Sequence, residues 1–162
     1  KYSHVILPGV GAFASGMKAL QSLGLDKALQ NHVKSGKPLL GICLGMQFLF
    51  ESSHEDGVTA GLGFVSGSVQ PIRIPGAKVP HMGWNDLQIQ KPSLGLSSGD
   101  HVYFVHSFHC VCDDQDDVCA YVDYEGRKLT VMVHKDNVWG CQFHPEKSGV
   151  SGLRVFQEFS KI

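Results

Sequence analysis

The sequence predicts an α/β fold in which a mostly parallel sheet is flanked by helices and carries an added β-rich portion. Two short apolar runs, residues 4–7 and 39–42, read as buried strands, and each is followed by a stretch with helical spacing. Strands that alternate with helices are typical of a parallel sheet with helical crossovers. Between about residues 61 and 133, in contrast, short β-rich pieces alternate with Gly, Pro and Asp turns.

The predicted elements follow one another along the chain without a linker. After the first strand, helical character extends from about residue 15 to residue 35, with a break near Gly24 and a stop at Gly36. The second strand runs directly into a predicted helix over residues 43–50. Further strands are predicted over residues 68–74, 101–106, 118–124, 129–133 and 138–143, and a closing helix over residues 148–159. Because no repeat or low-complexity segment interrupts this order, residues 1–162 are expected to form a single domain.

The composition argues against several classes of protein. Of the 162 residues, 43% are hydrophobic and 18% are charged, which is sufficient for a packed core. The formal net charge is −1 and Lys and Arg are not clustered, so we expect no nucleic-acid partner. No apolar stretch reaches the roughly 18 residues of a membrane-spanning helix, and no signal peptide is recognisable. Five cysteines, an odd number, argue against a disulfide framework and favour a cytoplasmic location.

The segment Gly41-Ile42-Cys43-Leu44-Gly45 lies between a predicted strand and a predicted helix. G-x-C-x-G in this position is the thiol form of the nucleophile elbow, in which a sharp turn raises the nucleophile above the sheet edge. The N–H groups at the start of the helix, including that of Leu44, are expected to lower the pKa of the thiol and to hold an oxyanion. A buried structural cysteine is the alternative interpretation. We predict that Cys43 is a nucleophile.

A thiolate nucleophile needs a base, and His144 is the candidate. It follows a predicted strand, so it is expected at the same carboxyl edge of the sheet as Cys43. Glu146 lies beyond Pro145, whose ring restricts the local backbone so that the His and Glu side chains can face each other. Glu146 would orient the imidazole and stabilise its cation. These residues predict a Cys-His-Glu triad.

A Pro-Gly-Val-Gly segment follows the first strand and allows two interpretations. Its glycines let the backbone approach a ligand closely, so Gly9 and Val10 are predicted to form an oxyanion strand. Residues 9–14 also match the dinucleotide fingerprint G-x-G-x-x-A. The acidic residue that follows, Asp26, lies within a predicted helix rather than at the end of the next strand. The oxyanion strand is therefore favoured.

Possible metal ligands in the sequence are interpreted as structural. A group of His and Cys residues crowds one predicted strand region: His106, His109, Cys110 and Cys112. Because residues 109 and 110 face opposite sides of a strand, this group cannot converge simply on one ion. The acidic run over residues 113–117 lacks the ligand spacing of a calcium loop and is predicted as a solvated turn. His81 and His134 are assigned to local structure, and we expect neither a metal nor a cofactor.

Several motifs together resemble those of the class I glutamine amidotransferases. The G-x-C-x-G and His-Pro-Glu motifs are shared by that whole class. The P-H-M-G-W-N segment at residues 80–85 and the Lys-Ser-Gly after His-Pro-Glu resemble the glutaminase subunits of imidazole glycerol phosphate synthases most closely. The matching segments are residues 7–13, 41–47, 78–85, 103–108 and 142–149, which span nearly the whole chain. The resemblance implies the class I amidotransferase fold, which is flavodoxin-like.

The resemblance also implies a role for each matching position. Cys43 would attack the side-chain amide of L-glutamine, and His144 would pass a proton to the departing ammonia and then activate water. The residues expected to hold the other end of glutamine are Gln47, Glu55, Ser107 and Phe108. The residues expected to face a partner are Trp84, Asn85 and Lys147.

That partner would be a (β/α)₈-barrel cyclase subunit, with which family members form a heterodimer. In histidine biosynthesis the barrel receives the ammonia and makes imidazole glycerol phosphate and an aminoimidazole carboxamide ribotide. The resemblance further implies that glutaminase activity is weak until the barrel has bound its own ligand.

The chain departs from the family before the segment that begins at His4, where family members carry another strand and helix. We therefore expect the first strand of the fold to be missing, which would expose apolar neighbours and unpaired backbone. An inactive truncated binding module is accordingly one alternative function. The others are a different class I amidotransferase, of the anthranilate or pyridoxal phosphate type, and a cysteine hydrolase or protease on a similar sheet. Residues 80–85 argue against the other amidotransferases.

Overall fold

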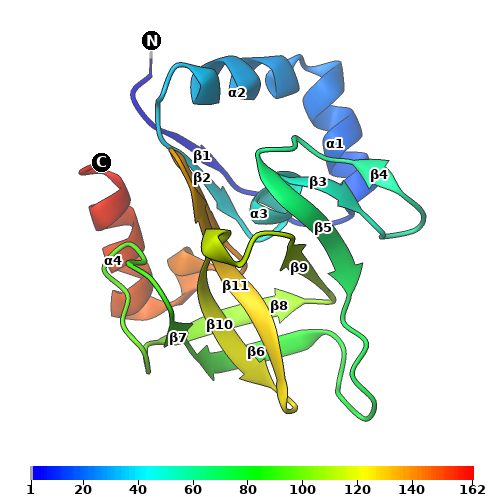
Figure 1. Ribbon diagram of the computed structural model, residues 1–162, viewed down its shortest axis with the longest axis vertical. Coiled ribbons are helices and arrows are strands. Elements are labelled where there is room, and N and C mark those ends of the chain that lie inside the picture. Colours follow the sequence, from blue (N-terminus) through cyan, green and yellow to red (C-terminus); the bar gives the residue numbers. More distant parts are fainter. Residues whose placement is uncertain (1) are drawn as a thin grey trace.

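Figure 1 shows the protein as a computed structural model, which describes residues 2–162. The helices are α1 (Phe13–Ser22), α2 (Leu25–Lys34), α3 (Leu44–Phe48) and α4 (Gly149–Phe159), with two 3-10 turns, η1 (Gln115–Asp117) and η2 (Pro145–Lys147). The strands are β1 (Val5–Leu7), β2 (Leu39–Ile42), β3 (Phe50–Ser53), β4 (Thr59–Ala60), β5 (Val65–Pro71), β6 (His81–Asp86), β7 (Gln88–Ile89), β8 (His101–His106), β9 (Phe108–Cys112), β10 (Val118–Tyr124), β11 (Arg127–Lys135) and β12 (Val138–Cys141).

The strands form one large mixed sheet and one small sheet. The large sheet has 10 strands, in the order β1-β2-β12-β11-β9-β5-β3-β4, with β10 paired to β11 and to β7. Strands β6 and β8 pair with each other in the second sheet. Helices α1 and α2 lie at one end of the molecule, whereas β6 and β8 lie toward the other end (Figure 1).

The parallel part of the large sheet places early and late strands side by side. Strand β2 lies between β1 and β12 and is parallel to both, with Leu7 paired to Gly41 and Cys141 paired to Ile42. All residues of β2 and of β12 are buried. A continuous apolar run of this kind is expected where both faces of a parallel sheet are covered. The residues that follow β2 and β12 consequently emerge at the same sheet edge.

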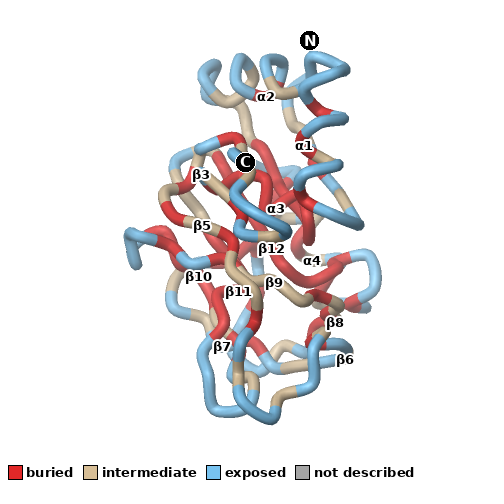
Figure 2. The backbone as a smooth tube through the Cα atoms, turned by 90° about the vertical axis from the view of Figure 1, so that its right-hand side faces the viewer, coloured by how far each residue is buried: buried red, intermediate tan, exposed pale blue. Residues whose placement is uncertain are grey.

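Helices cover the two faces of this parallel part. Leu39 packs in a cluster with Phe13 of α1, whereas the next residue, Leu40, packs in a second cluster with Val155 and Phe159 of α4. Successive side chains of a strand point to opposite faces, so the two clusters lie on opposite sides of β2. Figure 2 shows α3 and β12 as mostly buried and much of α2 as exposed.

The predicted α/β architecture is confirmed, with one error in its helices. The break near Gly24 is confirmed, because this residue has φ 68° and separates α1 from α2. The helix predicted over residues 43–50 is wrong in its last part, since α3 ends at Phe48 and Phe50 already pairs with Val65 in a parallel ladder. Sheet pairing here overrides the local helical spacing of apolar residues.

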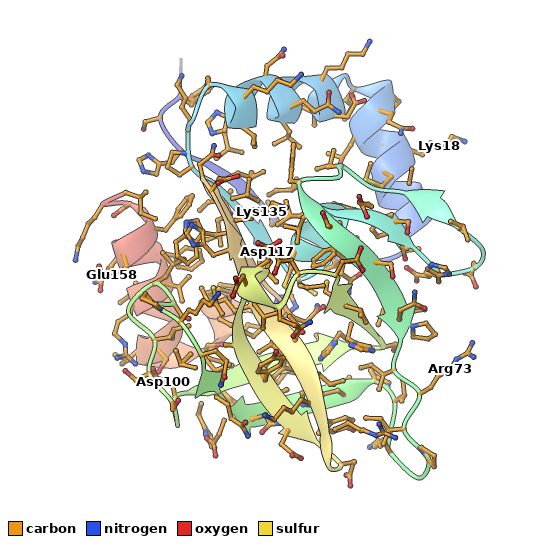
Figure 3. All side chains as sticks on the ribbon, in the orientation of Figure 1. Lys18, Arg73, Asp100, Asp117, Lys135 and Glu158 are labelled. Carbon is orange, nitrogen blue, oxygen red and sulfur yellow. The ribbon has the colours of Figure 1, made fainter. Side chains whose placement is uncertain are left out.

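The acidic segment before β10 is less exposed than predicted. Asp114 accepts a hydrogen bond from the N–H of Asp116 at 2.8 Å, as expected of a turn. Asp117, however, is buried, and its Oδ2 lies 3.6 Å from Nζ of Lys135 (Figure 3). The prediction of a solvated turn is wrong for Asp117, because its neighbour on β11 supplies a cation that the sequence pattern does not reveal.

Two further features were sought within residues 2–162: a membrane-spanning helix and a group of metal ligands. No helix within them is long and apolar enough to cross a membrane. Within the same residues, no group of three or more His, Cys, Asp or Glu side chains is arranged to hold a metal ion.

Candidate active site

Cys43 occupies the turn between β2 and α3, as the G-x-C-x-G pattern predicts. Its backbone has φ 55° and ψ −112°, a conformation that is strained for a residue other than glycine. The Cys43 N–H donates to the carbonyl of Cys141 on the neighbouring strand at 2.8 Å, which anchors the turn. The residue is only 7% exposed, and it lines a cavity. The local sequence therefore builds a nucleophile elbow.

Close packing on either side of Cys43 requires the two glycines of the motif. A β-carbon on Gly45 would overlap the carbonyl oxygen of Leu7. A β-carbon on Gly41 would lie 2.6 Å from the carbonyl oxygen of Gly45. Both obstacles are backbone atoms, so a larger residue at either position would force strand and helix apart.

The backbone of His144 is fixed by hydrogen bonds to β8. The His144 N–H donates to the carbonyl of Tyr103 at 3.0 Å, and the Tyr103 N–H donates to Oγ of Ser148 at 3.0 Å. The Ser148 hydroxyl in turn donates to the carbonyl of His144 at 2.7 Å. These three bonds close a ring between the His-Pro-Glu turn and β8.

The imidazole of His144 is oriented by Glu146. Nδ1 of the ring lies 2.7 Å from Oε1 of the carboxylate. Because an ionised carboxylate only accepts, Nδ1 carries the proton of this bond, and Nε2 is the basic nitrogen of the neutral ring. Nε2 is buried and has no hydrogen-bond partner among residues 2–162. It is therefore available to accept a proton from a thiol.

One cavity of about 370 Å³ brings most of the predicted site residues together. Cys43 and His144 both line it. The other predicted residues in its lining are Val10, Leu44, Gln47, Glu55, Ser107, Phe108 and Lys147. Predicted residues outside the lining are Gly9, Trp84, Asn85 and Glu146.

Two residues predicted for the oxyanion site are engaged with each other. The Leu44 N–H donates to the carbonyl of Gly9 at 3.3 Å. A β-carbon on Gly9 would lie 3.2 Å from that of Leu44, so this approach favours glycine. Val10 is exposed at the cavity beside them. The carbonyl of Gly9 must move away before the Leu44 N–H can bind a substrate oxygen.

The Cys43 thiol does not have the lowered pKa that the sequence predicted. Burial has the largest effect and raises the pKa of Cys43, and the charge of Glu146 raises it further. Hydrogen bonds from the Leu44 N–H and the Gln142 side chain lower the pKa without reversing the effect of burial. The prediction was wrong because it considered only the helix start. The thiol therefore depends on a base to lose its proton.

The residues predicted to hold the far end of glutamine also have partners within the chain. Gln47 Nε2 donates to the carbonyl of Phe108 at 3.4 Å and so connects α3 to β9. Glu55 Oε2 accepts from the N–H of Phe13, the first residue of α1, at 2.9 Å. A carboxylate at this place is stabilised by the unpaired N–H groups of the helix. Glu55 thus holds α1 in place while it lines the cavity.

Nearly the whole chain matches one protein family. Residues 2–161 match the family described as glutamine amidotransferase class-I. The chain belongs to this family.

Curated relatives within the family are about half identical to this chain over the aligned residues. The "Imidazole glycerol phosphate synthase subunit HisH" of Caldanaerobacter subterraneus subsp. tengcongensis is 46% identical, over 99% of this chain and 80% of the relative. The protein of the same name from Streptococcus gordonii is 51% identical, over 97% of this chain and 76% of the relative. Among solved structures, that of PurLQS from Thermotoga maritima is similar with a TM-score of 0.73 at 21% identity, covering 99% of this chain and 79% of that one. This structural likeness supports the amidotransferase fold.

The sequence did not single out two features of this amidotransferase site. Gln142 is wholly buried, and its Nε2 donates to Sγ of Cys43 at 3.7 Å. The second feature is a buried pair in which Nδ1 of His81 lies 2.9 Å from Nε2 of His106, which lines the cavity. A signal for Gln142 was present, because it is a polar residue within an otherwise apolar run that leads to His144.

Of the three residues predicted to face a partner, Lys147 lines the cavity, whereas Trp84 and Asn85 do not. Trp84 is 54% exposed on β6, and its ring meets that of Tyr103 edge-on, with 6.0 Å between centroids. Lys147 Nζ lies 5.8 Å from the centroid of the same Tyr103 ring. Asn85 is half-buried, and its side-chain amide donates to the carbonyl of Asp123 at 2.9 Å.

Proposed function

We propose that this chain is the glutaminase subunit of an imidazole glycerol phosphate synthase and that it hydrolyses L-glutamine to glutamate and ammonia. The chemistry is carried by one observation: Cys43 shares a cavity with His144, whose Nδ1 is hydrogen-bonded to Glu146. The choice of subunit is supported by the HisH relatives, which are similar over nearly the whole chain. The free cysteines fit a cytoplasmic location, where thiols stay reduced.

The first half of the reaction forms a thioester on Cys43. The thiol proton passes to Nε2 of His144, and Sγ attacks the side-chain amide carbon of glutamine. The C–N bond then breaks, and the same proton leaves with the amine as ammonia. Glu146 stabilises the imidazolium that forms between these two transfers.

The second half releases glutamate. His144 is neutral again after ammonia departs, so it can remove a proton from water as the water attacks the thioester. The carbon–sulfur bond breaks, and the thiol of Cys43 regains a proton. In both halves the amide oxygen carries negative charge, for which Leu44 and the Gly9–Val10 segment would supply N–H donors. This requires the Leu44 N–H to separate from the carbonyl of Gly9, which it contacts at 3.3 Å.

The α-amino and α-carboxyl groups of glutamine are proposed to bind at the part of the cavity lined by Gln47, Glu55 and the Ser107–Phe108 backbone. Glu55 offers a carboxylate, which suits an ammonium group, and the backbone N–H groups suit a carboxylate. These contacts bind both ends of the amino acid and align its amide with Cys43.

The ammonia is proposed to pass to a (β/α)₈-barrel cyclase subunit that docks on the outer face of β6 and β8. Trp84 supplies an exposed aromatic side chain on this face, and Lys147 supplies a cation between the face and the cavity. Aromatic residues are enriched at partner interfaces, and a cation at the rim of an interface can attract a complementary charge. Because the amide of Asn85 is already engaged by Asp123, we expect a smaller contribution from Asn85. Docking at the cavity mouth would keep ammonia from escaping into solvent.

Glutamate release from glutamine tests this proposal, measured with the barrel subunit and its ligand present and absent. We expect release that rises strongly with the loaded partner and falls by at least about 10³-fold in Cys43→Ala, because the nucleophile is removed. A folded protein that releases no glutamate with a competent partner would contradict the proposal and favour an inactive binding module.

A further inference from the structure

Gln142 is a buried polar side chain in direct contact with the proposed nucleophile. It follows β12, is 0% exposed, and its backbone N–H donates to the carbonyl of Val131 at 2.9 Å. Its side-chain Oε1 accepts from Nε2 of Gln47 at 3.1 Å, and its Nε2 donates to Sγ of Cys43 at 3.7 Å. Burying a primary amide is unfavourable unless its donors and acceptor are satisfied, so these contacts hold the side chain in one orientation.

The direction of these hydrogen bonds is set by the carbonyl of Phe108. A carbonyl only accepts, so the group that Gln47 presents to it at 3.4 Å is its NH₂. The same NH₂ faces Gln142, which must therefore present its oxygen to Gln47. The NH₂ of Gln142 is then left for the sulfur of Cys43. Rotating either amide by half a turn would bring like groups together at one of these contacts.

The same carbonyl is held from a second side. Nδ1 of His106 lies 2.8 Å from the oxygen of Phe108, so this nitrogen carries a proton. His106 and His81 are both buried, and they fix the carbonyl that orients Gln47. The His81–His106 pair, the Phe108 carbonyl and Gln47 together therefore fix which end of the Gln142 amide faces Cys43.

We propose that Gln142 is a catalytic residue that stabilises the Cys43 thiolate and links it to glutamine bound at Gln47. The inference rests on the function proposed above. When the thiol proton moves to Nε2 of His144, negative charge develops on Sγ, and the NH₂ of Gln142 keeps both of its protons while it donates to that charge. A donor to a thiolate favours the charged form, which burial opposes at this position.

Two substitutions of Gln142 test the role of its NH₂ donor apart from the role of its acceptor oxygen. Gln142→Glu keeps an oxygen that accepts from Gln47 and replaces the donor with a carboxylate, whereas Gln142→Leu removes both groups at similar volume. Gln21→Glu is the matched control for added charge, because Gln21 is exposed on α1. Thermal unfolding identifies the variants that fold.

The measured quantity is the rate at which iodoacetamide alkylates Cys43 as a function of pH. We expect the midpoint of this profile to rise by about one pH unit or more in Gln142→Leu, and further in Gln142→Glu, with at least about tenfold slower alkylation at neutral pH. In the presence of partner, kcat for glutamate release should fall by about the same factor, with a smaller change in KM. An unchanged alkylation profile in a folded Gln142 variant would overturn the proposal.

A measurement on the unmodified chain covers the case in which neither variant folds. The side-chain NH₂ resonances of Gln142 should shift with pH at the midpoint of Cys43 ionisation, and this shift should vanish in Cys43→Ala. Resonances that do not respond to pH would contradict the proposal. Alkylation and resonance shifts do not depend on glutamine hydrolysis, so the two proposals can fail separately. If both signals behave as expected and no glutamate is released, the proposed function and the catalytic role of Gln142 are contradicted, whereas stabilisation of the Cys43 thiolate by Gln142 is not.

Discussion

The parallel strands around Cys43 and the small β6–β8 sheet are built in different ways. Every residue of β2, α3 and β12 is buried. Along β6 and β8, by contrast, buried or half-buried residues alternate with more exposed ones, so that each strand has an inner and an outer face. The first region holds reacting groups in a fixed geometry by packing. The second region contributes Val105 and His106 to the cavity wall, and its outer face is the one on which we propose that a partner docks.

Glycine residues show the same contrast at atomic scale. A β-carbon on Gly45 would overlap the carbonyl oxygen of Leu7, whereas one on Gly83 in β6 would meet nothing within 4 Å. Gly83 has φ +125°, so a substitution there introduces backbone strain alone. A Gly→Ala substitution should therefore destabilise the parallel region much more than the β6–β8 sheet.

The largest expected effect is that of Gly45→Ala on stability. The methyl group would displace backbone on both β1 and α3, so the free energy of unfolding should fall by more than about 4 kcal/mol. Gly83→Ala should cost only about 1–3 kcal/mol, the usual range for strain at one residue. Urea denaturation followed by circular dichroism measures both values. Equal losses for the two variants would show that the packing contrast is not real.

The second expected effect is a loss of folding stability in acid, caused by the buried histidines on the inner face of β6 and β8. Burial lowers the pKa of His106 to about 3, with further lowering from the nearby imidazoles of His81, His109 and His144, while the Phe108 carbonyl opposes the shift. The unfolded chain therefore binds a proton at His106 below about pH 6.5, whereas the folded chain does not until about pH 3. The contribution of His106 to the free energy of unfolding is therefore complete above about pH 6.5. It falls by about 1.4 kcal/mol per pH unit as the pH is lowered from there toward pH 3.

The pH dependence of the free energy of unfolding between pH 6.5 and 4.5 measures this contribution. His81 shifts in the same direction, because burial lowers its pKa as well. We expect His106→Gln to flatten the slope, and His54→Gln, at an exposed position, to leave it unchanged. A slope that His106→Gln does not alter would mean that the buried pair makes no contribution to acid stability.

The smallest effect concerns the outer face of the same sheet. Trp84→Ala should weaken binding to the barrel subunit by about 1–2 kcal/mol, a loss of roughly 5- to 30-fold in affinity, because exposed aromatic residues often dominate interfaces. Its free energy of unfolding should change by less than about 0.5 kcal/mol. Leu23→Ala, at another exposed apolar residue beyond α1, is the control. Isothermal calorimetry reports the affinities, and an unchanged value for Trp84→Ala would remove this face from the proposed interface.

The sequence predicted the position of the proposed triad because each part depends on local chemistry. A glycine-flanked Cys after a buried strand, and a His followed by Pro and Glu after another, are patterns that specify turns at strand ends. Parallel pairing of β2 with β12 then places the two turns at one edge. Other residues that line the cavity, among them Gln47, Ser107 and Phe108, were predicted only from the resemblance to the amidotransferase family.

Features that depend on distant neighbours could not be predicted in this way. The pKa of Cys43 is governed by burial under segments far along the chain. Gln142 meets Gln47 across a separation of 95 residues, and the sequence contains no local signal of that contact. The length of α3 was likewise set by pairing of β3 with β5 rather than by helical spacing. Local sequence patterns therefore predict where the reacting residues lie, whereas the pKa of Cys43 and its contacts depend on tertiary packing.

Cys43 is proposed above as the nucleophile of a site that binds glutamine. Labelling with a chloroketone analogue of glutamine, followed by peptide mass mapping, is the sharpest test of this role. The other cysteines serve as internal controls because none of them lines the cavity: Cys110, Cys112, Cys119 and Cys141. We expect a single adduct, on Cys43, that forms more slowly when glutamine is added. An adduct on another cysteine, no adduct at all, or labelling that glutamine does not slow would show that Cys43 is not the nucleophile of a glutamine site.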